Sequence, residues 1–233
     1  MNRFEQPRHA DMIIKICGMR YPENIKEITP LTPMMMGFIF YPESPRDATG
    51  IDESVVKNLP SYIRPVAVTV NRTFDEIIDL CDRYGFKIVQ LHGDETPGLC
   101  QRLKDAGLIV FKAVSVGDSV DKSLLESYQK SVDLFLFDTK SDKRGGSGQK
   151  FSWDLLENYD LDVPYLLSGG ISPDDAEAVV GAMRPGMAGI DINSRFEDSP
   201  GHKDLGKLIK FIVKLRSYNE YEPTKVPFWE KEI

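Results

Sequence analysis

A thiol and a carboxylate stand at matching places in this chain of 233 residues. Cys17 ends an apolar run at 12–16 and is followed by Gly18, and Asp138 ends a second apolar run at 132–137. If both runs are strands, both side chains lie at carboxyl ends, where the loops of α/β enzymes bind ligands. A thiolate accepts a proton and a carboxylic acid donates one, so the pair predicts a base and an acid for proton transfer.

Eight β-branched or aromatic runs recur along the chain, separated by segments with the apolar spacing of helices. A repeat of roughly 22 to 31 residues favours an α/β fold, a single (β/α)8 TIM barrel, over an open doubly wound sheet. A Rossmann-type fold is the weaker alternative because no G-x-G-x-x-G follows the first run. The predicted strands are 13–17, 36–40, 65–70, 87–92, 109–114, 133–138, 164–168 and 188–192.

Helix-start signals and composition divide the chain into three parts. We expect a polar N-terminal tail at 1–11, a TIM-barrel catalytic domain at 12–216 and a C-terminal extension at 217–233. Typical N-terminal residues open four of the helices, and the last helix is predicted at about 203–216. Pro22 lies near the start of the first of these helices, Thr73 and Thr96-Pro97 precede two others, and Ser172-Pro173-Asp174-Asp175 precedes the fourth.

The composition limits the partners that the protein is expected to have. The net charge is -7, so a basic surface for nucleic acid is not expected. The first eleven residues lack the apolar centre of a secretory signal, and no run approaches the length of a membrane span. We therefore expect a cytoplasmic protein without a membrane partner, and a monomer or a homodimer remains open.

Cysteine and histidine usage argues against a metal site or a disulfide framework. The three cysteines are odd in number and lack paired spacing, and the three histidines are scattered. Cys81 and Cys100 lie on predicted helix faces and are expected to be inert core thiols. We therefore assign no metal.

Strand alternation predicts a buried ion pair beside Cys17. Lys15 shares the face of Cys17, so its ammonium points into the barrel and needs a partner. Asp191 is the candidate because it faces the same way on the last strand, which closes against the first. An ordinary thiol is mostly protonated at neutral pH, and the charge of Lys15 is expected to favour the thiolate.

Loops after the seventh and eighth strands predict a phosphate site. Ser168-Gly169-Gly170 and Asn193-Ser194-Arg195 occupy the two loops where barrel enzymes commonly bind phosphate through backbone N–H groups. A third glycine-rich segment at 145–148 follows basic residues and suits a lid over an anionic substrate. Arg46, after the second strand, presents a guanidinium that suits a carboxylate, although a solvated loop arginine is the alternative.

Taken together, these motifs resemble those of phosphoribosylanthranilate isomerase over roughly residues 13 to 215. The resemblance implies a TIM barrel of tryptophan biosynthesis that needs neither metal nor organic cofactor, and a small phosphoribosyl substrate. The motifs, in order, are Lys15-Ile16-Cys17-Gly18, Gly37-Phe38-Ile39-Phe40, Ser44-Pro45-Arg46, Gln90-Leu91-His92-Gly93, Asp138 with 145–148, Ser168-Gly169-Gly170, Gly189-Ile190-Asp191 and 200–204.

The resemblance also implies a division of roles in an Amadori rearrangement. Asp138 is the expected acid that protonates the ribose ring oxygen of N-(5-phosphoribosyl)anthranilate, and the Cys17 thiolate is the expected base at C2. The product is 1-(2-carboxyphenylamino)-1-deoxyribulose 5-phosphate, and Arg46 is expected to bind the anthranilate carboxylate. The residues implied in phosphate binding are Gly169, Gly170, Ser194 and Arg195, with Ser147 and Gly148.

Some positions depart from the family pattern, and two kinds of alternative function remain open. The departures are Arg20 for threonine, Thr69 for phenylalanine, Ser168 for alanine, and Arg195-Phe196 for a small residue and valine. They bear on rate and fine specificity rather than on the type of reaction. Whether an aminoimidazole ribotide is also a substrate is left open by the sequence. The alternatives are another phosphosugar barrel, such as ribulose-phosphate epimerase or indoleglycerol-phosphate synthase, and a non-catalytic barrel that binds a phosphorylated metabolite.

Overall fold

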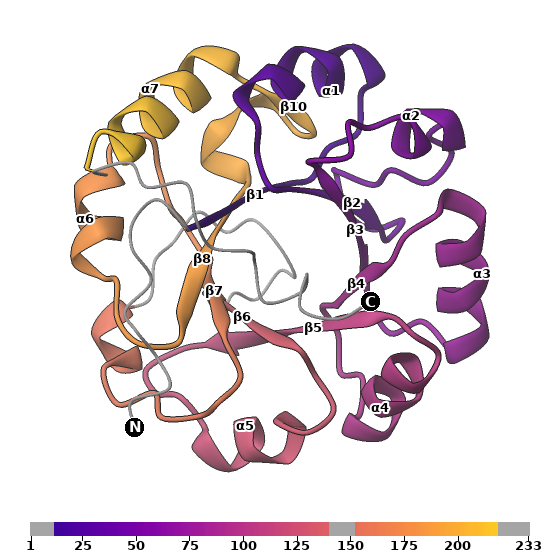
Figure 1. Ribbon diagram of the computed structural model, residues 1–233, viewed down its shortest axis with the longest axis vertical. Helices are drawn as coiled ribbons and strands as arrows, with labels where there is room; N and C mark the ends of the chain where they lie inside the picture. The colour runs from indigo at the N-terminus through magenta and orange to yellow at the C-terminus, as the bar shows by residue number, and fades with distance from the viewer. Residues whose placement is uncertain (1–11, 140–151, 219–233) are drawn as a thin grey trace.

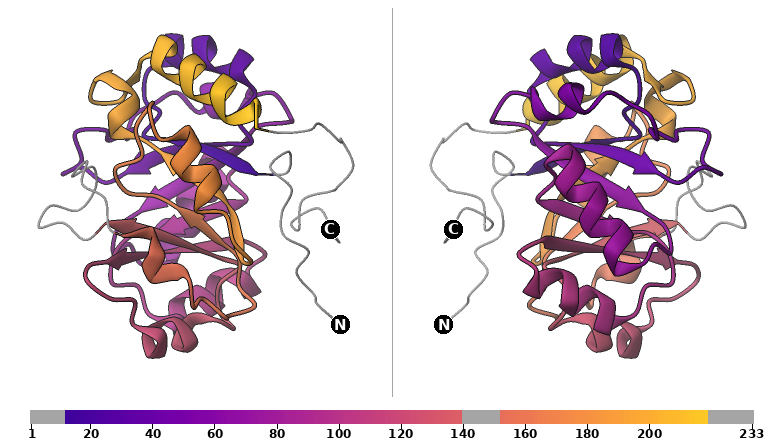
Figure 2. Two further views of the ribbon diagram at one scale, coloured as in Figure 1. Left: turned by 90° about the vertical axis from the view of Figure 1, so that its left-hand side faces the viewer. Right: turned by 90° about the vertical axis from the view of Figure 1, so that its right-hand side faces the viewer.

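Eight parallel strands close into one barrel, with helices around the outside (Figures 1 and 2). This computed structural model describes residues 12–139 and 152–218, so the predictions for 1–11, 145–148 and 219–233 lie outside the described residues. Each strand pairs in parallel with the next one along the chain, and the last pairs with the first, which closes the sheet. The predicted TIM barrel is confirmed.

The observed strands match the eight predicted runs within a few residues. Helices lie between most successive strands, and the segment after β8 carries a short hairpin that the sequence patterns did not predict. The strands are β1 Ile13–Cys17, β2 Met35–Phe40, β3 Arg64–Thr69, β4 Ile88–Leu91, β5 Ile109–Val116, β6 Leu134–Thr139, β7 Tyr165–Leu167 and β8 Met187–Ile192. The hairpin is β9 Glu197–Ser199 and β10 His202–Lys203.

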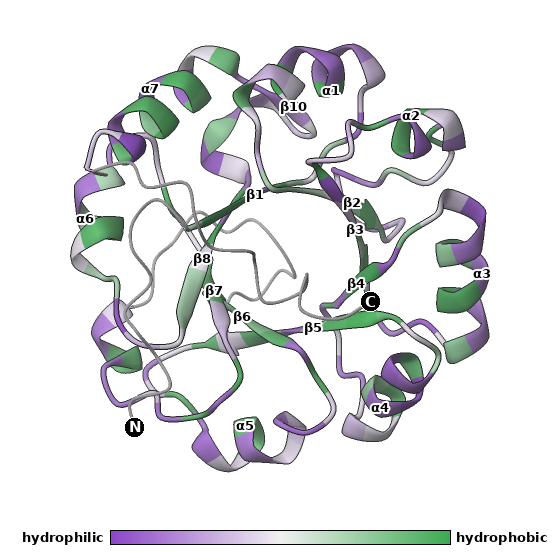
Figure 3. Cartoon of the chain, viewed as in Figure 1, coloured by the Kyte–Doolittle hydropathy of each residue, from purple (hydrophilic) through white to green (hydrophobic). Residues whose placement is uncertain are grey.

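The helices alternate hydrophobic and hydrophilic stretches, as Figure 3 shows for α3 and α7. Their apolar faces pack on the outer surface of the strands. The α-helices are α1 Pro22–Ile28, α2 Glu53–Lys57, α3 Phe74–Tyr84, α4 Pro97–Asp105, α5 Lys122–Tyr128, α6 Ala176–Gly181 and α7 Leu205–Arg216. The 3-10 helices are η2 Thr29–Leu31, η3 Trp153–Leu156 and η4 Ser194–Phe196.

Side-chain caps mark where several of the helices begin, among them α3 and α7. Thr73 and Glu76 form a reciprocal capping box at α3, as expected from the sequence. The stretch 172–175 precedes α6, as predicted: the Asp175 carboxylate accepts hydrogen bonds from the backbone N–H and hydroxyl of Ser172, which makes a turn, and α6 begins at Ala176. Asp204 likewise caps α7, which shortens the last predicted helix.

Two apolar layers hold the barrel together, one on each face of its strands. The outer layer, between strands and helices, includes Ile16 and Phe38, and the inner layer includes Met35 and Phe111. Burial of apolar surface on both faces is the main stabilising term of this architecture. In the part of the chain that the structure describes, no helix is long and apolar enough to cross a membrane.

Candidate active site

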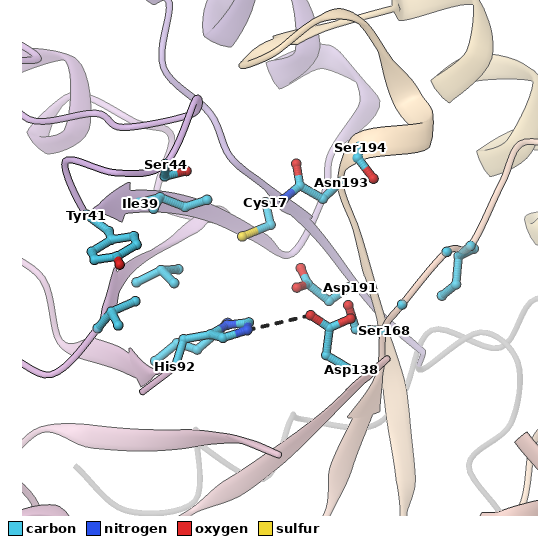
Figure 4. Close-up of a pocket in the computed structure, with 16 residues that line it drawn as sticks. Cys17, Ile39, Tyr41, Ser44, His92, Asp138, Ser168, Asp191, Asn193 and Ser194 are labelled. Carbon is cyan, nitrogen blue, oxygen red and sulfur yellow. Dashed lines mark hydrogen bonds and ion pairs between the residues drawn. The ribbon is translucent and has the colours of Figure 1, made fainter. Parts of the chain in front are cut away.

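A cavity opens at the carboxyl ends of the strands, and Cys17 and Asp138 both face it (Figure 4). It contains about 770 Å³ of empty space, including the part open to solvent. Cys17 comes from β1 and Asp138 from β6, so strands that are distant in the chain bring the two together. The other lining residues are Ile39, Tyr41, Ser44, Val68, Val70, Gln90, His92, Ser168, Gly169, Gly170, Ile171, Asp191, Asn193 and Ser194.

Asp138 forms one wall of the cavity with His92, which directly follows β4. Nε2 of His92 lies 3.6 Å from Oδ2 of Asp138, and the backbone N–H of Thr139 donates to Oδ1 at 2.8 Å. Gln90 Nε2 lies 3.2 Å from Nδ1 of His92. If the amide donates there, the imidazole hydrogen sits on Nε2 and faces Asp138. The carboxyl group is thus oriented at the cavity, with its side chain 18% exposed.

Cys17 forms the opposite wall and is almost fully buried, at 3% exposure. Lys15 Nζ donates to Asp191 Oδ1 at 2.9 Å, so the predicted ion pair is present. The two residues are neighbours in the register of β1 and β8. Burial opposes the charge of Lys15, but Asp191 and Cys17 outweigh it and raise the pKa of the ammonium.

The thiol is not poised as a thiolate by Lys15 in the way the sequence suggested. Burial, followed by the charge of Asp191, raises the pKa of Cys17 above its ordinary value, although Lys15 and Lys203 lower it. Lys15 therefore acts in the predicted direction but is outweighed. Cys81 and Cys100 lie on helices, where burial raises their pKa values to about 12 and about 11.

The predicted phosphate loops lie at the cavity, with Gly169, Gly170 and Ser194 among its lining residues. Gly169 has a φ of +83°, and a Cβ there would collide with the Thr139 side chain and lie 3.1 Å from Asp138 Oδ1. This glycine therefore lets the β7 loop pass close to the acid. Arg195 follows Ser194 in η4 but does not line the cavity, and Ser147 and Gly148 lie outside the described residues.

Arg46 is paired with an internal carboxylate rather than exposed to solvent. Its Nε lies 2.9 and 3.0 Å from the two carboxylate oxygens of Glu197, and Nη2 lies 2.7 Å from Oε2. The side chain of Arg46 is 10% exposed and does not line the cavity, whereas Ser44 from the same loop does. The alternative of a solvated loop arginine is therefore wrong, and the carboxylate role remains a prediction.

Two of the departures from the family pattern lie away from the cavity lining. Arg20 donates to the backbone oxygen of Pro45 at 3.2 Å and its guanidinium lies over the Tyr21 ring. Thr69 is fully buried on β3, and its hydroxyl has no hydrogen-bond partner among the described residues. Ser168, in contrast, lines the cavity beside the glycine pair.

Sequence reasoning missed several residues that shape the site. His92 lies at the carboxyl end of a predicted strand, as Cys17 does, but its sequence context predicted only a place in the Gln90-Leu91-His92-Gly93 motif and no role beside Asp138. Lys203 belongs to the 200–204 motif of the resemblance, but nothing in the sequence placed it or Glu197 beside Arg46, because the β9–β10 hairpin was not predicted. Among the described residues, no group of three or more His, Cys, Asp or Glu side chains is arranged to hold a metal ion.

A family model and a curated relative both assign the chain to the same protein family. The model of the N-(5'phosphoribosyl)anthranilate (PRA) isomerase family matches residues 14–214. The chain is 40% identical over 206 residues to the N-(5'-phosphoribosyl)anthranilate isomerase of Parabacteroides distasonis, covering 88% of this chain and 93% of that protein.

Solved structures are similar as well. One is a phosphoribosyl anthranilate isomerase in complex with reduced 1-(o-carboxyphenylamino)-1-deoxyribulose 5-phosphate, with 28% identity, a TM-score of 0.72 and coverage of 88% of this chain and 99% of that chain. Another shows monomers generated from the dimeric isomerase of Thermotoga maritima, with 28% identity, a TM-score of 0.71 and the same coverage.

Proposed function

Because the chain belongs to the N-(5'-phosphoribosyl)anthranilate isomerase family, and is thus an isomerase of tryptophan biosynthesis, we propose that Asp138 and Cys17 perform its two proton transfers. The observation that carries this proposal is that the two side chains face one cavity from opposite walls. The reaction converts N-(5-phosphoribosyl)anthranilate to 1-(2-carboxyphenylamino)-1-deoxyribulose 5-phosphate. The reaction needs one proton donor and one proton acceptor, placed on opposite sides of the reacting carbons.

Asp138 acts first, as the general acid. Its carboxyl group gives a proton to the ribose ring oxygen while the bond from that oxygen to C1 breaks. The nitrogen lone pair then forms the C1–N double bond of a Schiff base. His92 and the Thr139 N–H orient the carboxyl group, and its partial exposure allows it to regain a proton from water.

Cys17 acts second, as the general base. Its thiolate removes the C2 proton, and the electron pair of that bond forms a C1–C2 double bond and neutralises the Schiff-base nitrogen. The resulting enolamine becomes the ketone when C1 gains a proton and the C2 hydroxyl loses one, so that the C1–C2 double bond is replaced by the C2 carbonyl. Because burial raises the pKa of the free thiol, the cationic Schiff base of the bound substrate supplies the positive charge that favours the thiolate.

The two anionic ends of the substrate need separate anchors. We assign the carboxylate to Arg46, through charge-assisted hydrogen bonds. We assign the phosphate to backbone N–H groups of the loops after β7 and β8, where glycines permit close approach. The phosphate residues in this proposal are Gly169, Gly170, Ser194 and Arg195, with Ser147 and Gly148.

The assembly and location of the protein are also proposals. The solved relative from Thermotoga maritima is described as dimeric, and we propose a monomer or a homodimer for this chain. Sedimentation analysis at several protein concentrations distinguishes the two. The net charge of -7 supports a protein that does not bind nucleic acid, and we propose the cytoplasm as its location.

Loss of substrate fluorescence tests the function directly. Phosphoribosylanthranilate is generated in the cuvette from anthranilate and phosphoribosyl pyrophosphate, and the wild-type protein is compared with Cys17→Ala. We expect a rate well above the spontaneous background for the wild type and none for the variant. A rate in both proteins removes Cys17 from the mechanism, and a rate in neither points to a non-catalytic or differently specific phosphosugar-binding barrel.

A further inference from the structure

Glu197 lies at the centre of a buried charge cluster beside the cavity. Its carboxylate accepts two hydrogen bonds from Nε of Arg46 and one from Nη2, and Lys203 Nζ donates to it at 2.6 Å. The side chains of Glu197 and Lys203 are 4% and 0% exposed. Burial opposes the charge of Glu197, but the two cations outweigh it and lower the pKa of that carboxyl. Burial also lowers the pKa of Lys203, and the charge of Glu197 opposes that shift. The pairing within the cluster therefore favours the charged form of each group.

The cluster uses only one edge of the guanidinium. Glu197 occupies the edge formed by Nε and Nη2, and among the described residues Nη1 has no hydrogen-bond partner. A guanidinium can hold a second carboxylate on the edge formed by Nη1 and Nη2. The charges of Arg46, Lys203 and Glu197 sum to +1, so the cluster still attracts an anion after its internal pairing.

The Arg46 side chain packs against Gly18, the residue that follows the proposed base Cys17. Gly18 has a φ of +75°, and a Cβ there would lie 2.8 Å from Cδ of Arg46 and 2.7 Å from Oδ1 of Asn193. Lys203 Nζ donates to the same Asn193 oxygen at 2.7 Å. Cys17 and Asn193 both line the cavity, so the Arg46 side chain passes beside the backbone that joins the proposed base to the next residue, although Arg46 is not itself a lining residue.

We propose that Glu197 is a positioning residue that determines specificity for a substrate carboxylate. By holding the Nε edge of Arg46, it leaves the Nη edge as the receptor for an aromatic carboxylate, already oriented before the substrate binds. Such pre-orientation removes the ordering cost of a long side chain from binding. Lys203 balances the negative charge of Glu197, which would otherwise repel the incoming carboxylate. This inference rests on the proposed function of Arg46.

The test compares two ligands that differ only in the carboxylate. One is reduced 1-(o-carboxyphenylamino)-1-deoxyribulose 5-phosphate, and the other is its counterpart with a plain phenyl ring. Calorimetric titration of wild type and Glu197→Gln with each ligand separates carboxylate recognition from phosphate binding. We expect the variant to bind the carboxylated ligand about tenfold more weakly and the phenyl ligand as the wild type does, with a raised KM and a nearly unchanged kcat.

The neighbouring Asp198→Asn provides a matched control. Asp198 lies on the same short strand but is 55% exposed and pairs with His202, so its removal deletes the same charge outside the cluster. We expect wild-type binding of both ligands in this control. If Glu197→Gln keeps the wild-type ratio of the two affinities, or weakens both ligands equally, the inference is overturned, because the residue is then only structural.

A second background covers the case in which Glu197→Gln alone does not fold. In Glu197→Gln the buried Lys203 ammonium loses its carboxylate partner, which could prevent folding, and Lys203→Met removes that unpaired cation. Ligand binding is therefore compared between the double variant, Lys203→Met with Glu197→Gln, and the single variant Lys203→Met. The same selective loss of the carboxylated ligand is expected, and its absence contradicts the inference. Wild-type protein that isomerises its substrate but does not distinguish the two ligands refutes the Arg46 role, whereas wild type without isomerase activity refutes the proposed function itself.

Discussion

The two walls of the cavity place their proton-transfer groups in very different surroundings. On the acid wall, the side chains of Asp138 and His92 are 18% and 20% exposed, and backbone and imidazole contacts orient the carboxyl group. On the base wall, Cys17 is almost fully buried, and the ion pair of Lys15 and Asp191 lies against it. The acid can exchange its proton with water, whereas the base depends on fixed charges.

This difference indicates that the walls use different means to control a proton. An exposed carboxyl group needs only orientation, because solvent supplies and removes its proton. A buried thiol responds to each charge around it, since a nonpolar environment screens charges weakly. The base wall is therefore the more sensitive of the two to substitution and to substrate binding.

The largest effect is expected from removal of the base. Cys17→Ala should lower kcat by about 10³-fold to 10⁴-fold, because a methyl group accepts no proton and the neighbouring Asp191 carboxylate is held in an ion pair with Lys15. Single-turnover kinetics measures this loss. Binding of the reduced product analogue should stay close to that of the wild type, and a comparable loss of binding contradicts a purely catalytic role.

Removal of the acid should cost less, about 10²-fold to 10³-fold in kcat, because a partly exposed site admits water as a substitute donor. The change is Asp138→Asn, measured by the same fluorescence assay. Asp133→Asn is the matched control: Asp133 lies just before the opposite end of β6 and pairs with Lys104. It should leave kcat unchanged, and equal losses in both variants contradict the acid role of Asp138.

A smaller effect is expected from crowding of the acid wall. Gly169→Ala places a methyl group against Thr139 and Asp138, and should lower kcat/KM roughly tenfold by shifting the acid. Gly107→Ala is the control, because Gly107 also has a positive φ, +87°, but its Cβ meets nothing within 4 Å. In the control, thermal unfolding should show a free energy of unfolding lower by about 1–2 kcal/mol, because alanine is strained at a positive φ. The activity of the control should be normal.

The smallest and most specific effect is on pH dependence. Because the pKa of Cys17 is raised, kcat/KM should rise with pH through neutrality and level off only above the ordinary range of a thiol. Lys203 lowers this pKa, so Lys203→Met should shift the rise to higher pH. A rise at the same pH in both proteins shows that Lys203 has no influence on the thiol.

The family and the positions of the proposed base and acid were predictable because they depend on local patterns. Alternation along β1 and β8 put Lys15 and Asp191 on the inner face, and closure of the barrel then made them neighbours in register. The positions of Cys17 and Asp138 followed from a single rule, that carboxyl ends of parallel strands meet at one face.

The sequence by itself thus determined the eight-stranded barrel and the strand ends that carry the proposed base and acid, since the periodicity of side chains is a local property of the chain. Only the tertiary structure decided that Glu197 pairs with Arg46, 151 positions away, and that His92 faces Asp138. It also decided the net direction of the Cys17 pKa shift. These features depend on loop paths and on burial, which arise from packing of the whole barrel and have no signature in any single segment.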